Sequence, residues 1–320
     1  MKDLLKKVPI PTAGVALGLA ALGNLLQEYS EMAHIICGVC AFVMVALLLG
    51  KVVTFPRMIR NDFEDSILAS VSATCFMTLM QLALYVEPFA HEFAFALWCV
   101  AIAAHFALML WFTKKFILHF RLVHVFPTYF IAYVGIIVAS LTSPAFGAQT
   151  FGMVVFWFGF ACYAVLLVVV TLRYVKHEVP EAARPLICIY AAPMSLSLAG
   201  YLAVSPQPNE VFVLVLAVLA QVLFALVAFV LPRILRLNFY PSYAAMTFPF
   251  VITAIGLKNT MVFFSGLGTQ IPWWIQGLEA VEAVFAACMV IYVFAHYLHY
   301  FFKKVEEPVP VPAVENQRIW

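Results

Sequence analysis

Charged residues are scarce in this sequence. Asp, Glu, Lys and Arg make up 11% of the 320 residues and apolar residues 65%, whereas soluble domains carry roughly 25% charged residues. Apolar runs long enough to cross a hydrocarbon core about 30 Å thick recur from one end of the chain to the other. This scarcity of charge leaves no room for a soluble domain between the runs and predicts an all-α integral membrane protein.

Motifs for catalysis and for nucleotide binding are missing as well. The chain has no phosphate-binding loop and no Ser/His/Asp set, so we predict that it is not an enzyme. The net charge of +2 predicts no nucleic-acid partner. All seven cysteines fall in apolar segments, where a thiol is mostly a small hydrophobe, so we predict neither a disulfide nor a metal site.

A haem protein is the alternative that the histidines raise. His91, His105 and His119 are spaced by 14 residues, a separation that can place two haems on one membrane helix. Only His105 lies deep in a predicted span, and His34 and His296 lie near opposite ends of theirs. Because the set of axial ligands is incomplete, we predict no cofactor.

The apolar runs predict ten membrane-spanning helices. We place them at residues 8–27, 31–52, 66–86, 92–113, 126–143, 150–172, 185–204, 210–232, 241–265 and 273–302. Consecutive spans are expected to form five helical hairpins within one transmembrane domain of residues 1–320. The hairpins cover about residues 8–52, 66–113, 126–172, 185–232 and 241–302.

Basic residues are missing from every second connection between these spans. Seventeen of the 18 Lys and Arg residues fall before the first span, or at or after the end of an even-numbered span, and only Lys258 falls deep inside a span. Loops rich in Lys and Arg stay in the cytoplasm. The sequence therefore predicts a multi-pass protein with both termini in the cytoplasm, including a short tail at residues 303–320.

Prolines mark an internal repeat in the odd-numbered spans. Those near the span starts are Pro11, Pro127, Pro185 and Pro241, which are separated by 116, 58 and 56 residues. Two inner prolines, Pro193 and Pro249, each follow eight residues after the last two of these. Similarity at a fixed period indicates repeated structural units. We therefore predict five hairpins in a quasi-five-fold ring around a central pore.

Small and polar residues are concentrated in the odd-numbered spans, whereas the even-numbered spans are dense in Leu, Val, Phe and Met. We expect the odd spans to face inward. Two interpretations of their faces stay open, because small residues either line a pore or let helices pack closely. Helix breakers at membrane depth, here Pro193 and Pro249, favour a pore, since irregular backbone is tolerated there mainly inside protein or against a water-filled cavity.

These features resemble a known transporter family. Ten spans in five hairpins, odd helices with breakers and the segment Ala-Met-Thr-Phe-Pro-Phe at residues 245–250 are similar to the tellurite-resistance and dicarboxylate transporter family. That family includes bacterial TehA and the slow anion channels of plant guard cells, and the resemblance covers nearly the whole chain. It implies a homotrimer in the lipid of a bacterial inner membrane. Each subunit is then expected to hold its own pore, blocked by one phenylalanine, for which Phe248 is the match.

The repeat register extends this expectation to other residues. The equivalents of Phe248 are Gly18, Val134 and Ala192, which are all smaller, as expected if one unit supplies the plug. The residues that we expect to line the pore are Thr12, Gly14, Gly18, Ser72, Val134, Gly135, Ala192, Pro193, Ser195, Pro249 and Thr253.

The absence of acidic residues inside the odd spans indicates the sign of the solute. Cation-selective filters use rings of carboxylates or ordered carbonyls, and neither can be read in the sequence. Five helix amino termini at the inner mouth mildly attract anions. One feature points the other way, because proline kinks expose the carbonyls of Ile189 and Ala245. We predict a channel for small monovalent anions such as chloride or nitrate. The alternative is a proton-coupled carrier of C4-dicarboxylates or tellurium oxyanions.

Lys258 needs a partner, because an ionisable residue inside a span is functional by default and costly to leave unpaired. Glu279 and Glu282 lie at a similar depth on the last span. Lys258 follows Phe248 by ten residues, which turns it about 80° off the face of the plug. We therefore predict an intramembrane ion pair of Lys258 with these glutamates in preference to a pore-lining charge.

Overall fold

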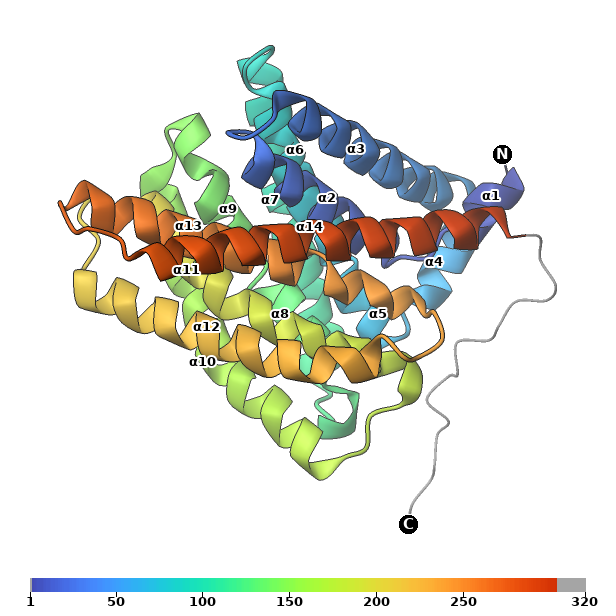
Figure 1. The fold of residues 1–320 in the computed structure, drawn as a ribbon. Coiled ribbons are helices and arrows are strands. Elements are labelled where there is room, and N and C mark those ends of the chain that lie inside the picture. The colour runs from blue at the N-terminus through green and yellow to red at the C-terminus, as the bar shows by residue number, and fades with distance from the viewer. Residues whose placement is uncertain (1, 304–320) are drawn as a thin grey trace.

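The computed structural model describes residues 2–303, which form helices joined by short loops and contain no strand (Figure 1). The predicted tail beyond Lys303 lies outside the described residues. Three short helices occupy connections between the predicted spans. They are α1 (Lys2–Lys7), α4 (Pro56–Asp62) and the 3-10 turn Leu122–His124.

Five long helices correspond to the even-numbered predicted spans. They are α3 (Glu31–Thr54), α7 (His91–Phe112), α10 (Gln149–Lys176), α12 (Glu210–Ile234) and α14 (Trp273–Phe302), and α7 continues into a π-helical turn at Thr113–Ile117. Only 28–39% of the residues in the most apolar stretch of each are buried inside the protein. Their remaining surface is rich in exposed Val, Leu and Phe side chains, which suits contact with lipid.

The odd-numbered predicted spans form shorter or interrupted helices. They are α2 (Thr12–Leu26), α5 (Ser66–Val71) with α6 (Ala73–Val86), α8 (Thr128–Tyr133) with α9 (Ile137–Thr142) and the 3-10 turn η3 (Ser143–Phe146), the 3-10 stretch η4 (Glu181–Ala191) with α11 (Ala192–Val204), and η5 (Pro241–Met246) with α13 (Phe248–Gly266). Three of these spans are 61–78% buried, and nearly every residue of α2 is buried. The prediction that the odd spans face inward is confirmed.

Eight helical segments within residues 2–303 are long and apolar enough to cross a membrane. The two other predicted spans coincide with shorter apolar helices, Thr12–Leu26 and Ile137–Phe146. A helix of 15 residues such as α2 rises only about 22 Å, which is less than the hydrocarbon thickness. The fold is therefore that of an all-α multi-pass membrane protein, and membrane crossing by the two short segments stays a prediction.

Side-chain caps explain where several helices begin. The Ser30 hydroxyl accepts the N–H of Ala33 at the start of α3, and the Asn209 side chain accepts that of Phe212 at the start of α12. The Asp65 carboxylate accepts two backbone N–H groups at the start of α5, at 2.8 and 2.9 Å. Such caps satisfy N–H groups that have no partner within the helix, and each contributes typically about 1 kcal/mol.

Four of the five odd spans are interrupted. The 3-10 stretches η4 and η5 precede α11 and α13, and Pro193 and Pro249 lie in the first turn of those helices, where a missing N–H costs least. The breaks predicted at these prolines are confirmed. Two further breaks, at Ser72 and at residues 134–136, contain no proline and were not predicted.

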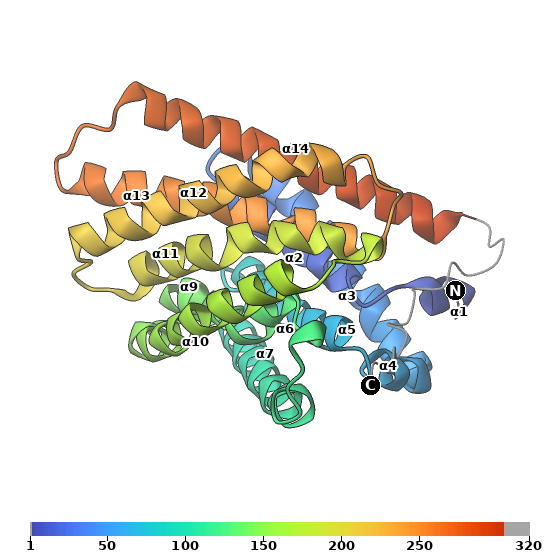
Figure 2. The same cartoon turned by 90° about the horizontal axis from the view of Figure 1, so that it is seen from below.

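The helices of the five odd spans contact one another in a closed sequence. α2 packs against α6, α6 against α9, α9 against α11, α11 against α13, and α13 against α2. The long helices cover the outside of this set. In Figure 2, for example, α11 lies between α10 and α12, and both outer helices contact it. The buried core of the described chain is thus centred on the five odd spans.

Candidate functional site

The break in the ninth span lies directly before the predicted plug residue. η5 ends at Met246, Thr247 has the non-helical angles φ −105° and ψ −89°, and α13 begins at Phe248. The Thr247 hydroxyl donates to the carbonyl of Ala244 at 2.7 Å and lies 3.0 Å from the carbonyl of Gly14 on α2. This anchor fixes the position of Phe248, whose side chain is 5% exposed.

The two glycines of α2 form the surface that receives this break. A Cβ atom at Gly18 would lie 2.5 Å from the Thr247 Cβ and 3.1 Å from the Phe248 nitrogen, and one at Gly14 would lie 3.2 Å from the Ala244 Cβ. Real Cβ atoms do not approach other atoms so closely without a shift of the neighbour. Gly14 and Gly18 therefore serve close helix packing, which is the second of the two interpretations left open by the sequence.

The seventh and ninth spans meet through hydroxyl groups on their α-helices. Ser195 of α11 and Thr253 of α13 lie 58 residues apart in sequence, and their hydroxyl oxygens are 3.2 Å apart. Each hydroxyl is also within 2.9 Å of the carbonyl four residues earlier in its own helix. Gly256 allows this approach, because a Cβ there would lie 3.3 Å from the Ser195 carbonyl oxygen.

The 3-10 stretch η4 satisfies one of the two carbonyls that the proline kinks were expected to expose. The carbonyl of Ile189, which a regular α-helix would leave without the N–H of Pro193, accepts the N–H of Ala192. A 3-10 bond to the residue three positions later thus replaces the missing α-helical bond. This carbonyl is therefore not free to coordinate a cation.

The predicted pore-lining residues all lie in the buried interior of the odd spans. For the residues other than glycine and proline, the exposed fractions are 0% for Thr12, 9% for Ser72, 1% for Val134, 8% for Ala192, 0% for Ser195 and 1% for Thr253. The predicted glycines and prolines, Gly14, Gly18, Gly135, Pro193 and Pro249, are buried too. Solvent barely reaches these positions, so the interior is closed in this conformation.

Two buried hydroxyls at the starts of odd spans have no hydrogen-bond partner among residues 2–303. They belong to Thr12, the first residue of α2, and Thr128, the first residue of α8, and both side chains are fully buried. Each follows a proline of the internal repeat, Pro11 or Pro127. An unsatisfied buried hydroxyl is costly and rare. Thr128 was not among the predicted site residues, although its place after Pro127 repeats that of Thr12.

The predicted ion pair of Lys258 with Glu279 and Glu282 is wrong. The Lys258 ammonium lies 2.7 Å from a carboxylate oxygen of Glu28, which follows the end of α2, and 5.1 Å from the ring centre of Tyr29. The cause is the contact of α13 with α2, which brings the end of α2 within reach of this long side chain. Lysine extends its charge toward the membrane edge in this way. Lys258 therefore has a structural partner and does not point to the plug.

Glu279 and Glu282 are buried without such a partner. Their exposed fractions are 5% and 1%. Within residues 2–303, neither oxygen of Glu282 nor the Oε1 atom of Glu279 has a hydrogen-bond partner in good geometry, although the Gln221 side chain of α12 lies beside Glu282. Both lie on α14, an outer helix that packs on α13 and α2. A buried carboxyl group inside a membrane span is a functional candidate by default.

The deep histidine has a structural contact. His105 of α7 is fully buried, and its Nε2 atom lies 3.0 Å from the Ala132 carbonyl. Within the described chain no three His, Cys, Asp or Glu side chains gather closely enough to hold a metal ion. His105 therefore ties the outer helix α7 to the end of α8, as its hydrogen bond shows.

One comparison with known proteins places the chain. A family model described as "Voltage-dependent anion channel" matches residues 7–298, which is nearly the whole chain. This match confirms the family resemblance predicted from the sequence. No curated protein matches the chain.

Proposed function

The chain belongs to the voltage-dependent anion channel family, and we propose that it conducts small monovalent anions of the chloride or nitrate type. The family are channels and transporters, not enzymes, and anion transport in general follows from membership. The pathway, its gate and the choice of ion are our proposals. The observation that carries them is the buried Phe248 at the Thr247 break, held against α2.

The proposed pathway runs along the axis of a ten-helix, five-hairpin ring. Support comes from the closed order of contacts, in which each inner unit packs against two others and α13 returns to α2. Neighbouring inner units also meet through polar side chains, as Ser195 and Thr253 do. A central axis surrounded by interrupted helices is the arrangement in which membrane proteins place their solute sites.

Phe248 is proposed as the gate of this axis. Its ring is 5% exposed, and its backbone is the first residue of α13 after the break. The residues at the equivalent positions, Gly18, Val134 and Ala192, are all smaller, as expected if one unit supplies the plug. Because the Thr247 hydroxyl bonds fix the backbone, we expect opening to require a movement of the ring alone or of the whole break.

Anion selectivity is supported by the distribution of charge. Among residues 2–303 the buried carboxyl groups belong to Glu279 and Glu282, both on the outer helix α14. The inner helices offer unpaired hydroxyl donors at Thr12 and Thr128. Hydroxyl donors at helix amino termini stabilise anions through hydrogen bonds and through the helix dipole.

Voltage clamp of cells that express Phe248→Ala tests the gate. We expect a larger anion current than in the wild type, because truncation removes the ring from the axis. Phe263→Ala is a matched control that loses the same side chain from the last turns of α13, and its current should stay at the wild-type level. An unchanged current in a well-expressed Phe248→Ala variant would remove Phe248 as the gate.

A proton-coupled carrier for C4-dicarboxylates or tellurium oxyanions is the second candidate. The observation that favours it is the pair of buried carboxyl groups, Glu279 and Glu282, since protonatable side chains inside membranes often carry coupling protons. A carrier shows saturable flux driven by a pH gradient and no open-channel current. Glu282→Gln should abolish the pH coupling if the carrier is correct, whereas an anion channel keeps its current.

We also propose that the protein is a homotrimer in a bacterial inner membrane with both termini in the cytoplasm. The supporting observations are the basic residues at one end of the helices and the exposed apolar faces of the outer helices. Cysteine labelling of intact cells at Lys2→Cys tests the orientation. Protection from an impermeant reagent is expected, and reaction with it would reverse the topology.

A further inference from the structure

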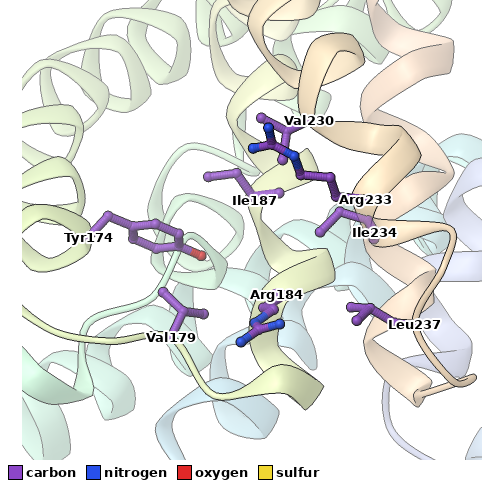
Figure 3. Close-up of a pocket in the computed structure, with 8 residues that line it drawn as sticks. All are labelled: Tyr174, Val179, Arg184, Ile187, Val230, Arg233, Ile234 and Leu237. Carbon is purple, nitrogen blue, oxygen red and sulfur yellow. The ribbon is translucent and has the colours of Figure 1, made fainter.

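A pocket lies on the outside of the protein, between η4 and the carboxyl-terminal parts of α10 and α12 (Figure 3). Its volume is about 320 Å³, and it is separate from the proposed axis because α10 and α12 belong to the outer helices. Its lining is formed by Tyr174, Val179, Arg184, Ile187, Val230, Arg233, Ile234 and Leu237.

Two arginines give this pocket its charge. Arg184 comes from η4 and Arg233 from the last turn of α12, and both line the pocket; in Figure 3 their guanidinium groups lie apart, that of Arg233 toward Val230 and that of Arg184 toward Val179. No acidic side chain of the described chain lies within 4.0 Å of either. Two unpaired guanidinium groups on different elements form a site for an anion with several oxygens, since arginine binds phosphate through parallel hydrogen bonds.

The rest of the lining is apolar and adds a second requirement. Val179, Ile187, Val230, Ile234 and Leu237 form the wall around the arginines. The hydroxyl of Tyr174 enters the same region in Figure 3 and has no hydrogen-bond partner in the described part of the chain. A ligand that fits this lining carries an anionic group and an apolar part next to it.

The position of the pocket identifies the source of such a ligand. Val175 and Phe229, one residue away from Tyr174 and Val230, are 79% and 76% exposed, which is the apolar surface expected toward lipid. Lys176 and Arg236 follow within a turn and are exposed. The pocket therefore lies where an apolar helix surface changes to a basic one, the level at which lipid headgroups meet a membrane protein.

We propose that this pocket binds the phosphate headgroup of an anionic phospholipid. Arg184 and Arg233 hold the phosphate oxygens once their exposed side chains turn toward each other across the pocket. The glycerol and acyl chains lie along Val230 and Ile187 toward the exposed face of α12. Basic pockets between transmembrane helices are suited to such headgroups. A free phosphate ion satisfies the arginines but leaves the apolar wall unused, so the lipid is the better ligand.

Native mass spectrometry of the full chain in detergent tests the proposal. Phosphatidylglycerol and phosphatidylcholine with identical acyl chains are added in separate experiments, and inorganic phosphate is added as a competitor. We expect retention of phosphatidylglycerol over phosphatidylcholine and no displacement by millimolar phosphate. Equal retention of the two lipids, or displacement by phosphate alone, overturns the lipid assignment.

Variants locate the binding within the protein. Arg184→Gln with Arg233→Gln should weaken phosphatidylglycerol retention about thirtyfold, as expected for two basic contacts at a membrane surface. The matched control, Arg57→Gln with Arg60→Gln on α4, makes the same change of charge at exposed arginines that do not line the pocket. Retention by this control should equal that of the wild type, and an equal loss in both pairs overturns the site.

A third variant tests shape and guards against misfolding. Val230→Trp fills the pocket while keeping both arginines, and size-exclusion chromatography shows whether each variant remains folded. We expect the folded Val230→Trp variant to lose selective retention of phosphatidylglycerol. Wild-type retention by this variant places the lipid elsewhere and overturns the proposal, even if the arginine variants fail to fold.

Discussion

The inner helix α13 and the outer helix α14 form one hairpin, yet they use polar residues in opposite ways. In α13, Thr253 and Thr260 donate to carbonyls four residues earlier, at 2.9 and 2.8 Å. In α14, Glu282 is buried with no hydrogen-bond partner in the described chain for either oxygen. The inner helix thus satisfies its polar groups locally, and the outer helix holds a carboxyl group that is left unsatisfied.

The same two helices differ in backbone continuity. α14 runs unbroken over 30 residues, whereas the span of α13 changes from 3-10 to α at Thr247. Interruption costs backbone hydrogen bonds, which inside a membrane must be replaced by other groups. Here the Thr247 hydroxyl and close helix packing supply the replacement. The inner helices are therefore shaped by contact with one another, and the outer helices by length and lipid.

The largest predicted effect on stability comes from comparing a glycine of an inner helix with a glycine of an outer helix. Gly18→Ala on α2 should lower the free energy of unfolding by about 1–3 kcal/mol, because the new Cβ overlaps the Thr247 side chain. Gly277→Ala on α14 meets no atom within 4 Å and should raise it by about 0.5–1 kcal/mol through helix propensity. Thermal unfolding in detergent measures both, and equal effects of the two substitutions contradict the difference between inner and outer helices.

The hydroxyl at the break gives the next effect. Thr247→Val keeps the side-chain shape but removes the hydroxyl contacts with Gly14 and Ala244, so we expect destabilisation by about 1–2 kcal/mol. Thr260→Val is the control, since its hydroxyl bonds only within α13, and it should change stability less. A Thr247→Val variant as stable as this control shows that the hydroxyl does not hold the break.

Sequence patterns predicted the helix pairs and their inward or outward facing because both follow from composition. Lipid-facing helices need apolar surface on most sides, and inner helices need small residues, so α12 and α13 differ visibly along the chain. The prolines at Pro193 and Pro249 also predicted two breaks correctly. The breaks at Ser72 and Gly135 contain no proline and were not predicted. Serine and glycine interrupt a helix only when packing favours it, and packing cannot be read from the sequence.

Long-range partners were the main part that the sequence could not predict. The spacing of Gly14 and Gly18 predicted close packing but not the partner, Thr247, more than 200 residues away. The partner of Lys258 was sought within its own hairpin, whereas the contact of α13 with α2 supplies Glu28. Both contacts form because α13 and the preceding break pack against α2, at the other end of the chain. No local sequence pattern predicts this packing.

Loss of the ion pair between Lys258 and Glu28 is expected to have a smaller effect on stability. Lys258 is 16% exposed at its side chain and Glu28 is 74% exposed, and pairs open to water contribute about 0–1 kcal/mol. Lys258→Met and Glu28→Gln should each lower stability by less than about 1 kcal/mol, and their double variant should lose no more than either alone. Anion selectivity should be unchanged. A Lys258→Met protein that expresses normally but loses anion selectivity would show that Lys258 acts in the pore.

The smallest predicted effect concerns the outer carboxyl group. Glu282→Gln keeps the size of the side chain and removes no ion pair, because no basic side chain of the described chain lies within 4.0 Å of it. We expect the free energy of unfolding to change by less than about 0.5 kcal/mol. Thermal unfolding checks this, with Glu282→Ala as the reference for lost packing. A large destabilisation by glutamine would reveal a partner for the carboxyl group and would remove the contrast between α13 and α14. An unchanged stability combined with altered pH dependence of transport would instead assign Glu282 to proton coupling, and the outer helix would then take part in function.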